Sequence, residues 1–421
     1  MEEFRSLYRL SFFGIVFIIF LGGGAMQFLF GLSNTVITFL LMVFMFSVYL
    51  LYANLRSQVL WTSILRYSLL LGLWIVLVGL IRGSHPVSVA TYLIFPLLPL
   101  SVHGFFFINY KEGFLSEREI CRYFFMIAIF QLPVLLVQKN FYDPLIVLNN
   151  SGQMIEWFDF MFGTFFIKSD HSLGAFLLLM VGLLLIKHHL FSFSKQERWV
   201  WVGYLSITLF LTESNISKLF LLVLLSSYLV IPFYKKLKSS MIFRVVALVF
   251  VIGISYIGYS VKDEKIIQDR LGGSLEKQTS LATAEKYYDL GTAKRFQIII
   301  VAYKKIPTKW IGDGPYSYFD IRTGKFKQTM HFTQLIWSYY DLGLVGLFLV
   351  ILYMIQLLKF LNIPRGIPLL FFGGIFFFYS LYTTVLSDIA IFFALFAMFN
   401  KNSLAVPQGG HTLVQPKSNL P

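Results

Sequence analysis

Residues 10–30 read LSFFGIVFIIFLGGGAMQFLF and contain no charged side chain. At 1.5 Å per residue, a helix of this length spans the ~30 Å hydrocarbon layer of a bilayer. Arg5 and Arg9 precede the run, but the run is too long for a signal-peptide core. We therefore expect a first membrane helix that is retained.

The rest of the chain repeats this pattern. Of 421 residues, 57% are hydrophobic and 13% are charged, whereas soluble domains average roughly 25% charged residues. Because lipid offers backbone amides no hydrogen-bond partner, each apolar block is expected to form a helix. We predict an all-α polytopic integral membrane protein with about twelve transmembrane helices. The predicted spans cover residues 10–31, 33–53, 62–81, 87–108, 119–138, 161–186, 197–212, 217–233, 242–261, 334–359, 367–385 and 387–400.

Two parts of this arrangement are less regular. The fourth span carries Pro86, Pro96 and Pro99. Proline inside a helix removes a backbone hydrogen bond, so a kink or break is expected there. The eleventh and twelfth spans are joined by almost no polar sequence, and the twelfth is short. Eleven spans followed by a re-entrant hairpin are therefore the alternative to twelve.

The charges of the short turns predict the orientation in the membrane. With the N-terminus inside, the even-numbered turns carry thirteen Lys and Arg residues, and the short odd-numbered turns carry three. Basic residues accumulate in short cytoplasmic turns, so both termini are expected in the cytoplasm. The formal net charge of +14 then reflects orientation, and nucleic acid is not an expected partner. No internal repeat is visible, which disfavours the common secondary-transporter folds.

One long external loop, residues 262–330, is predicted between the ninth and tenth spans. It contains 13 basic and 8 acidic residues, a net charge of +5 (13 minus 8). Residues 293–306 have the spacing of an amphipathic helix, which Pro307 ends, and residues 312–315 form a tight turn. A structured loop of this size is usually functional. The chain is thus divided into helices at 1–261, the loop at 262–330, helices at 331–401 and a tail at 402–421.

The loop carries the main candidates for a phosphate site. Arg295 follows Lys294 at the start of the amphipathic segment, and a guanidinium group can bind phosphate oxygens through two parallel hydrogen bonds. A lipid-linked diphosphate is one polyanion that this basic loop could meet at the membrane surface. The alternative is a charge that faces solvent or lipid headgroups. Arg322 forms a second basic group with Lys325 and Lys327.

His331 stands where the loop meets the tenth span. A neutral imidazole there could act as a general base or as a hydrogen-bond donor near neutral pH, although a lone histidine is more often structural. Other polar residues, including His171 and Asp388, are predicted at the outer ends of the spans, where charges tend to face a cavity or each other. Glu213 and Lys218 are close enough in sequence to pair, and Asp388 has no assigned role.

The sequence excludes several other classes of site. Cys121 is the single cysteine, so no intrachain disulfide and no thiolate metal site can form. The chain has no glycine-rich phosphate loop, no His-Glu-x-x-His metal motif and no Gly-x-Ser-x-Gly nucleophile motif. We therefore expect a site that uses neither a metal nor a cofactor.

Four segments in the second half of the chain form an ordered set of motifs. They are Gly163-Thr164-Phe165 followed by Ser172-Leu173-Gly174-Ala175-Phe176-Leu177; Phe210-Leu211-Thr212-Glu213-Ser214-Asn215; Arg295 followed by Ile311-Gly312-Asp313-Gly314-Pro315; and His331 followed by Gly343-Leu344-Val345-Gly346-Leu347. In the order, spacing and shared outer location of these segments, the chain resembles the superfamily of bacterial O-antigen polymerases and O-antigen ligases.

The resemblance implies a helical transmembrane body with one large structured periplasmic loop, in the inner membrane of a bacterium. Members of this superfamily transfer a glycan from undecaprenyl diphosphate to an acceptor hydroxyl. The arginine that follows Thr-x-Ser in the family is Asn215 here, and Lys218 is the nearest cation. By this resemblance the catalytic residues are Arg295 and His331, and the diphosphate is bound by Lys218, Lys294, Arg322 and Asn215.

The expected function is therefore that of a polymerase joining undecaprenyl-diphosphate-linked repeat units into O-antigen or a related polysaccharide. Its expected partners are the lipid-linked glycan, the lipid bilayer and a chain-length regulator protein. A ligase that transfers the glycan to lipid A–core is the alternative within the class. A flippase would be expected to carry charges through the mid-membrane, whereas the candidates here cluster at the outer boundary. A non-enzymatic assembly subunit would tolerate the loss of Arg295 and His331.

Overall fold

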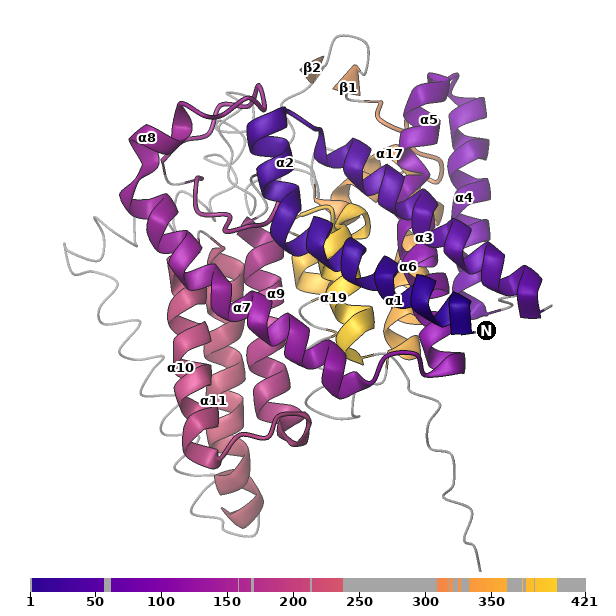
Figure 1. Cartoon of the computed structure of the whole chain (residues 1–421). Coiled ribbons are helices and arrows are strands. Elements are labelled where there is room, and N and C mark those ends of the chain that lie inside the picture. The colour runs from indigo at the N-terminus through magenta and orange to yellow at the C-terminus, as the bar shows by residue number, and fades with distance from the viewer. Residues whose placement is uncertain are drawn as a thin grey trace, which may run out of the picture.

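The computed structural model of the chain is built from α-helices (Figure 1). It describes residues 2–56, 62–157, 159–167, 170–212, 214–237, 309–317, 319–320, 325–326, 333–361, 373, 376–381 and 383–399. Within these ranges the sheet structure consists of one antiparallel pair, β1 (Phe319–Asp320) and β2 (Lys325–Phe326).

The helices follow the apolar blocks of the sequence. The first half of the chain contains α1 (Glu2–Phe17), a π-helical turn (Ile18–Gly22), α2 (Gly23–Phe30), α3 (Asn34–Arg56), α4 (Ser63–Ile81), α5 (Pro86–Tyr92), α6 (Ile94–Glu112), α7 (Glu117–Asn140) and α8 (Tyr142–Ile146). The second half contains α9 (Asp170–Ile186), a 3-10 turn (His188–Leu190), α10 (Lys195–Leu211), α11 (Asn215–Leu237), α17 (Gln334–Phe360), a 3-10 turn (Val385–Ser387) and α19 (Ile389–Phe399).

In the part of the chain that the structure describes, six helical stretches are long and apolar enough to cross a membrane. They are Glu2–Phe30, Asn34–Arg56, Ser63–Ile81, Pro86–Glu112, Glu117–Asn140 and Gln334–Phe360. Their outward faces are apolar as well: Leu10, Phe30 and Leu80 are each more than 70% exposed. A contiguous apolar exterior of this kind suits lipid and not water. The chain is thus a helical membrane protein.

The predicted break in the fourth span is confirmed. Helix α5 ends at Tyr92, about one helical turn before Pro96, and α6 begins at Ile94. Because Pro96 has no N–H, it cannot donate to the carbonyl of Tyr92. The carbonyl of Pro96 itself accepts hydrogen bonds from the Ser68 hydroxyl (2.8 Å) and from the Tyr353 hydroxyl (2.8 Å).

The predicted start of the sixth span at residue 161 is wrong, because α9 begins at Asp170. The segment ahead of it turns at Gly163, whose φ is +63°. Side chains of α7 bind its backbone: Gln138 accepts from Gly163 N (2.9 Å) and donates to Gly163 O (2.8 Å), and Gln131 accepts from Thr164 N (3.0 Å). Since these polar groups are satisfied without a helix, the segment can stay irregular inside the bundle.

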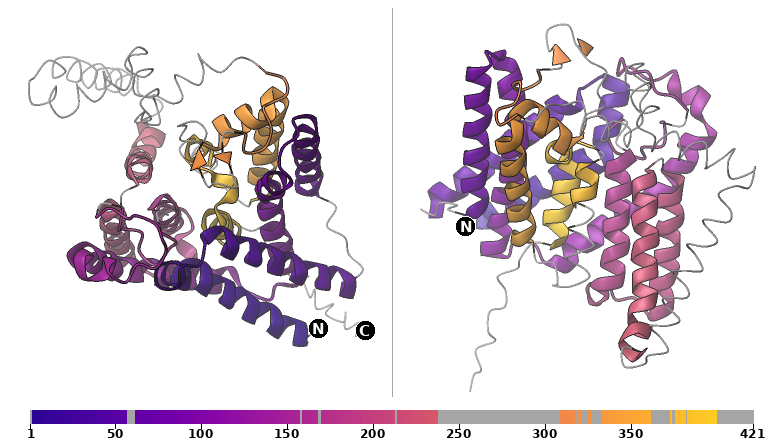
Figure 2. Two further views of the ribbon diagram at one scale, coloured as in Figure 1. Left: turned by 90° about the horizontal axis from the view of Figure 1, so that it is seen from above. Right: turned by 180° about the vertical axis from the view of Figure 1, so that it is seen from behind.

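Helix α19 is the described part of the predicted twelfth span. Its 11 residues are all buried, and at 1.5 Å per residue they cover about half of the ~30 Å hydrocarbon layer. Figure 2 shows α19 in the interior of the molecule, and it packs against α6 and α9. The predicted ninth span and most of the large loop lie outside the described residues, so the total of twelve spans stays a prediction.

Opposite ends of the bundle differ in character. At one end, ion pairs join Arg9 to Glu119, Arg56 to Glu112 (3.0 Å) and Lys187 to Glu117 (2.5 Å). Arg9 belongs to the N-terminal helix, and the other side chains in these pairs lie in even-numbered turns or at the helix ends beside them. The alternation of spans predicts that these parts of the chain lie at the same end of the bundle. We call this the ion-pair end. The assignment of this end to the cytoplasm rests on the charge pattern of the turns.

Candidate functional site

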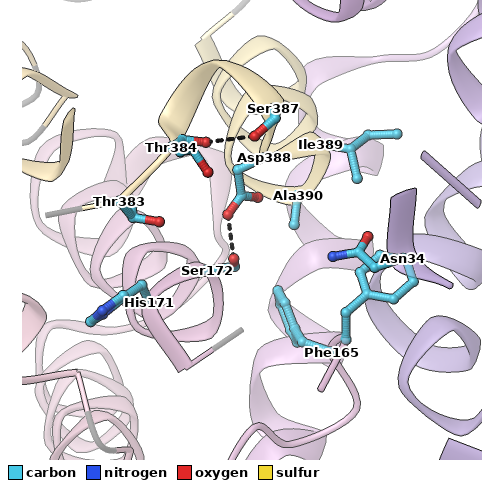
Figure 3. Close-up of a pocket in the computed structure, with 11 residues that line it drawn as sticks. Asn34, Phe165, His171, Ser172, Thr383, Thr384, Ser387, Asp388, Ile389 and Ala390 are labelled. Carbon is cyan, nitrogen blue, oxygen red and sulfur yellow. Dashed lines mark hydrogen bonds between the residues drawn. The ribbon is translucent and has the colours of Figure 1, made fainter. Parts of the chain in front are cut away.

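A polar cavity of about 150 Å³ lies at the end of the bundle opposite the ion pairs. It is enclosed by the first residue of α3, the start of α9 and the turn that leads into α19 (Figure 3). The residues that line it are Asn34, Phe165, Phe166, His171, Ser172, Thr383, Thr384, Ser387, Asp388, Ile389 and Ala390.

Asp388 is the acidic group of this cavity. It caps the N-terminus of α19, where Oδ1 accepts a hydrogen bond from Ile391 N (3.0 Å), and the Ser172 hydroxyl of α9 donates to Oδ2. Aspartate is a favoured cap residue because it satisfies the free N–H groups of the first helical turn. The two bonds fix the carboxylate between α9 and α19, and a carboxylate has acceptor capacity beyond two bonds.

His171 lies at the wall of the cavity and is connected to a chain of hydroxyl groups. Its Nδ1 is 3.1 Å from the Ser214 hydroxyl, which is 2.5 Å from the Ser217 hydroxyl, and Ser217 in turn bonds the hydroxyl of Tyr379. Helices α9 and α11 approach closely here, since a Cβ on Gly174 would lie 2.2 Å from Ser217 Oγ. The close packing holds the imidazole in place.

A second, apolar cavity of about 520 Å³ lies beside the same segment. It is lined by Leu21, Gly24, Ala25, Phe28, Leu29, Phe130, Pro133, Val134, Val137, Gln138, Leu145, Leu148, Phe160, Phe162, Gly163 and Thr164. Gly163 and Thr164 thus face the apolar cavity, and the next two residues, Phe165 and Phe166, face the polar one. One short stretch of backbone forms a shared wall between the two.

Residues 309–317, from the far end of the predicted loop, are bound to α4 and α17. Arg82 donates to the carbonyl of Gly312 (2.8 Å), and the buried carboxylate of Asp341 accepts from the Ser317 hydroxyl (2.9 Å). Gly343, with φ of +74°, interrupts α17, and Leu344 N then donates to Lys309 O (2.9 Å). Two of the motifs in the resemblance, the Gly-Asp-Gly turn and Gly343–Leu347, are therefore in contact.

A further contact connects α17 to the polar cavity. Gln334 N donates to Thr383 O (3.2 Å), and Gln334 Oε1 accepts from Leu386 N (3.2 Å). The segment that carries Asp388 is thereby joined to the start of α17. The described parts of all four motif segments lie at the end of the molecule that holds the two cavities.

The predicted site residues are only partly described. Arg295, Lys294, Arg322 and His331 lie outside the described residues, as does Glu213, the predicted partner of Lys218. Asn215 is exposed and Lys218 is half-buried, both in the first turn of α11. Neither of the two lines the polar or the apolar cavity. They stand beside Ser214, which belongs to the hydroxyl chain of His171.

Several residues of the polar cavity are not among the residues predicted from the sequence; they include Asn34, Thr383, Thr384 and Ser387. The signal available was a short polar stretch, residues 383–388, between two apolar blocks. Ser172 was noted only as part of a motif. In the described ranges, no group of three or more His, Cys, Asp or Glu side chains is arranged to hold a metal ion.

Comparisons of the chain with protein-family models, with curated proteins and with solved structures found no match.

Proposed function

We propose that the chain is a polymerase that joins undecaprenyl-diphosphate-linked repeat units into a surface polysaccharide at the periplasmic face of a bacterial inner membrane. The supporting observation is the pair of cavities that share the wall Gly163–Phe166, one polar and one apolar. A lipid-linked sugar has the same two parts, a polar glycan and a hydrocarbon chain. The type of reaction is proposed from the motif segments, which resemble those of the O-antigen polymerase and ligase superfamily.

The apolar cavity fits the isoprenoid chain. Its lining is almost entirely hydrocarbon and includes Phe28, Phe130 and Phe162. Transfer of apolar surface out of water gains about 25 cal/mol per Å², so the lipid chain has no reason to leave the bilayer during the reaction. A site beside such a cavity can receive the polar part of the donor while its anchor stays in lipid.

The proposed reaction is an inverting glycosyl transfer. An acceptor sugar hydroxyl attacks the anomeric carbon of the donor, the bond from that carbon to the diphosphate oxygen breaks, and the hydroxyl proton passes to a base. Arg295, with Lys218, Lys294 or Arg322 nearby, would stabilise the charge that develops on the diphosphate. Asn215 would contact the same group, and His331 would orient or deprotonate the hydroxyl.

The test is the surface-polysaccharide profile of cells on an electrophoretic gel. A deletion strain is expected to attach a single repeat unit. Arg295→Ala is also expected to shorten the polymer, while the amount of the protein in the membrane stays normal. Lipid A–core without glycan, together with accumulated lipid-linked polymer, would instead identify a ligase. Accumulation of the lipid-linked unit on the cytoplasmic side would identify a flippase. Unchanged polymer length in Arg295→Ala would refute the role given to this residue.

A further inference from the structure

None of the described residues given a role in the reaction above lines the polar cavity around Asp388. It combines a carboxylate, an amide, an imidazole, several hydroxyl groups and two aromatic rings in about 150 Å³. A liquid water molecule occupies about 30 Å³, so the space holds roughly five waters. A ligand that binds here must match the polar groups of the lining.

The charge of the lining argues against an ionic ligand. Among the described residues that enclose the cavity, none is Lys or Arg, and Asp388 is the acidic one. Among these lining residues, a phosphate or another anion would face the carboxylate without a compensating cation, which is unfavourable. A metal ion would find one carboxylate among the described lining residues, and it is already bonded to Ser172 and to Ile391 N. A neutral ligand with several hydroxyl groups meets neither obstacle.

The hydrogen-bonding groups suit such a ligand. Asn34 Oδ1 accepts from the Thr38 hydroxyl (3.1 Å), which fixes the amide. Figure 3 shows Asn34 across the cavity from Asp388, with its nitrogen on the cavity side. A hydroxyl placed between the two can accept from the amide of Asn34 and donate to the carboxylate of Asp388, since a hydroxyl does both. The hydroxyls of Thr383 and Thr384 extend the same edge.

Two phenylalanines also border the cavity. Phe165 and Phe166 line the cavity, and Phe165 is held by ring contacts with Phe20 and Phe176. Phe165 is 0% exposed and Phe166 is 2% exposed, so neither ring offers an open face to a ligand. The phenylalanines therefore limit the size of the cavity, and the polar groups of the lining carry the recognition.

We propose that this cavity binds one uncharged sugar ring of the glycan, with Asp388 and Asn34 bonding its hydroxyl groups. The identity of the ligand as a glycan rests on the proposed function. Ser172 acts as a positioning residue, because it contacts the sugar only through the Asp388 carboxylate that it holds. The shared wall at Gly163–Phe166 places this ring beside the apolar cavity, where the lipid chain of a substrate would lie.

The experiment uses the full chain in lipid nanodiscs and saturation-transfer NMR with neutral monosaccharides: glucose, galactose, mannose, rhamnose and N-acetylglucosamine. At least one of them is expected to receive saturation at millimolar concentration. Asp388→Asn is expected to weaken that binding at least tenfold, because an amide replaces one acceptor by a donor. Asparagine is also a good cap for α19, so the melting temperature is expected to stay close to that of the wild type.

Asp143→Asn is the matched control, since Asp143 is exposed in α8 and lines neither cavity. It is expected to leave binding unchanged. The proposal is overturned if no monosaccharide binds, if glucuronate or glucose 1-phosphate binds more tightly than every neutral sugar, or if Asp388→Asn binds like the wild type. Binding is measured without a lipid donor, so it is independent of transfer. Monosaccharide binding together with unchanged polymer in the deletion strain would refute the polymerase and leave the sugar site intact.

Discussion

Gly163 has a left-handed backbone conformation at the wall between the two cavities, with φ of +63°. A Cβ at this position would lie 2.3 Å from Gln131 Oε1 and 3.0 Å from a methyl group of Leu173. Gln131 cannot move away without loss of its hydrogen bond to Thr164 N. At the residue scale, two features therefore require glycine at this position: the left-handed backbone conformation and the lack of space for a side chain.

Gly163→Ala is expected to lower stability by more than about 2 kcal/mol, since the left-handed conformation alone costs roughly 1–2 kcal/mol for a residue with a Cβ and the contact with Gln131 adds to it. The measurement is thermal unfolding of the purified protein. Gly152→Ala is the control: its φ is +69°, but no atom lies within 4 Å of the added Cβ. Equal losses in the two variants would show that the contact with Gln131 is of no consequence.

At the scale of single elements, the sequence predicted the positions of most described helices and the break at the prolines, because both follow from local composition. The irregular segment at residues 161–167 could not be predicted in this way. It depends on Gln131 and Gln138, which lie some thirty positions earlier and appear in the sequence as ordinary polar residues of an apolar helix. The shortness of α19 was expected from its sequence, and its complete burial was not.

The contact between Arg82 and residues 311–312 is a second feature at this scale. The guanidinium group donates to the carbonyls of Gly312 (2.8 Å) and Ile311 (3.3 Å) and so holds the end of the predicted loop on α4. Arg82→Gln removes the charge and the forked geometry. Trypsin is expected to cleave after Lys309 several-fold faster in this variant, as followed by mass spectrometry. Lys139→Gln is the control, because Lys139 is exposed at the end of α7, and it is expected to leave the rate of cleavage unchanged. Equal rates in the wild type and in both variants would contradict the anchoring role of Arg82.

At the scale of the whole molecule, the ion pairs of Arg9, Arg56 and Lys187 occupy one end and the two cavities the other. The polar cavity is built from residues near positions 34, 165–172 and 383–390. No local pattern in the sequence connects these segments, so the cavity could not be predicted before the fold was known. The charges of the turns did predict which helix ends lie at the same side of the bundle. Successive spans cross the membrane in opposite directions, so alternate turns lie at the same side. The proposed function requires the cavity end to face away from the cytoplasm.

Labelling of single cysteines tests this claim most directly. Cys121 is buried and is the single cysteine of the chain, so Cys121→Ala provides a background without thiols. Trp310→Cys places an exposed thiol beside the cavity end, and Gln196→Cys places one at the start of α10, toward the ion-pair end. With a membrane-impermeant maleimide on spheroplasts, position 310 is predicted to react at once and position 196 only after lysis. The reverse order would place both cavities on the cytoplasmic side and contradict the proposed function.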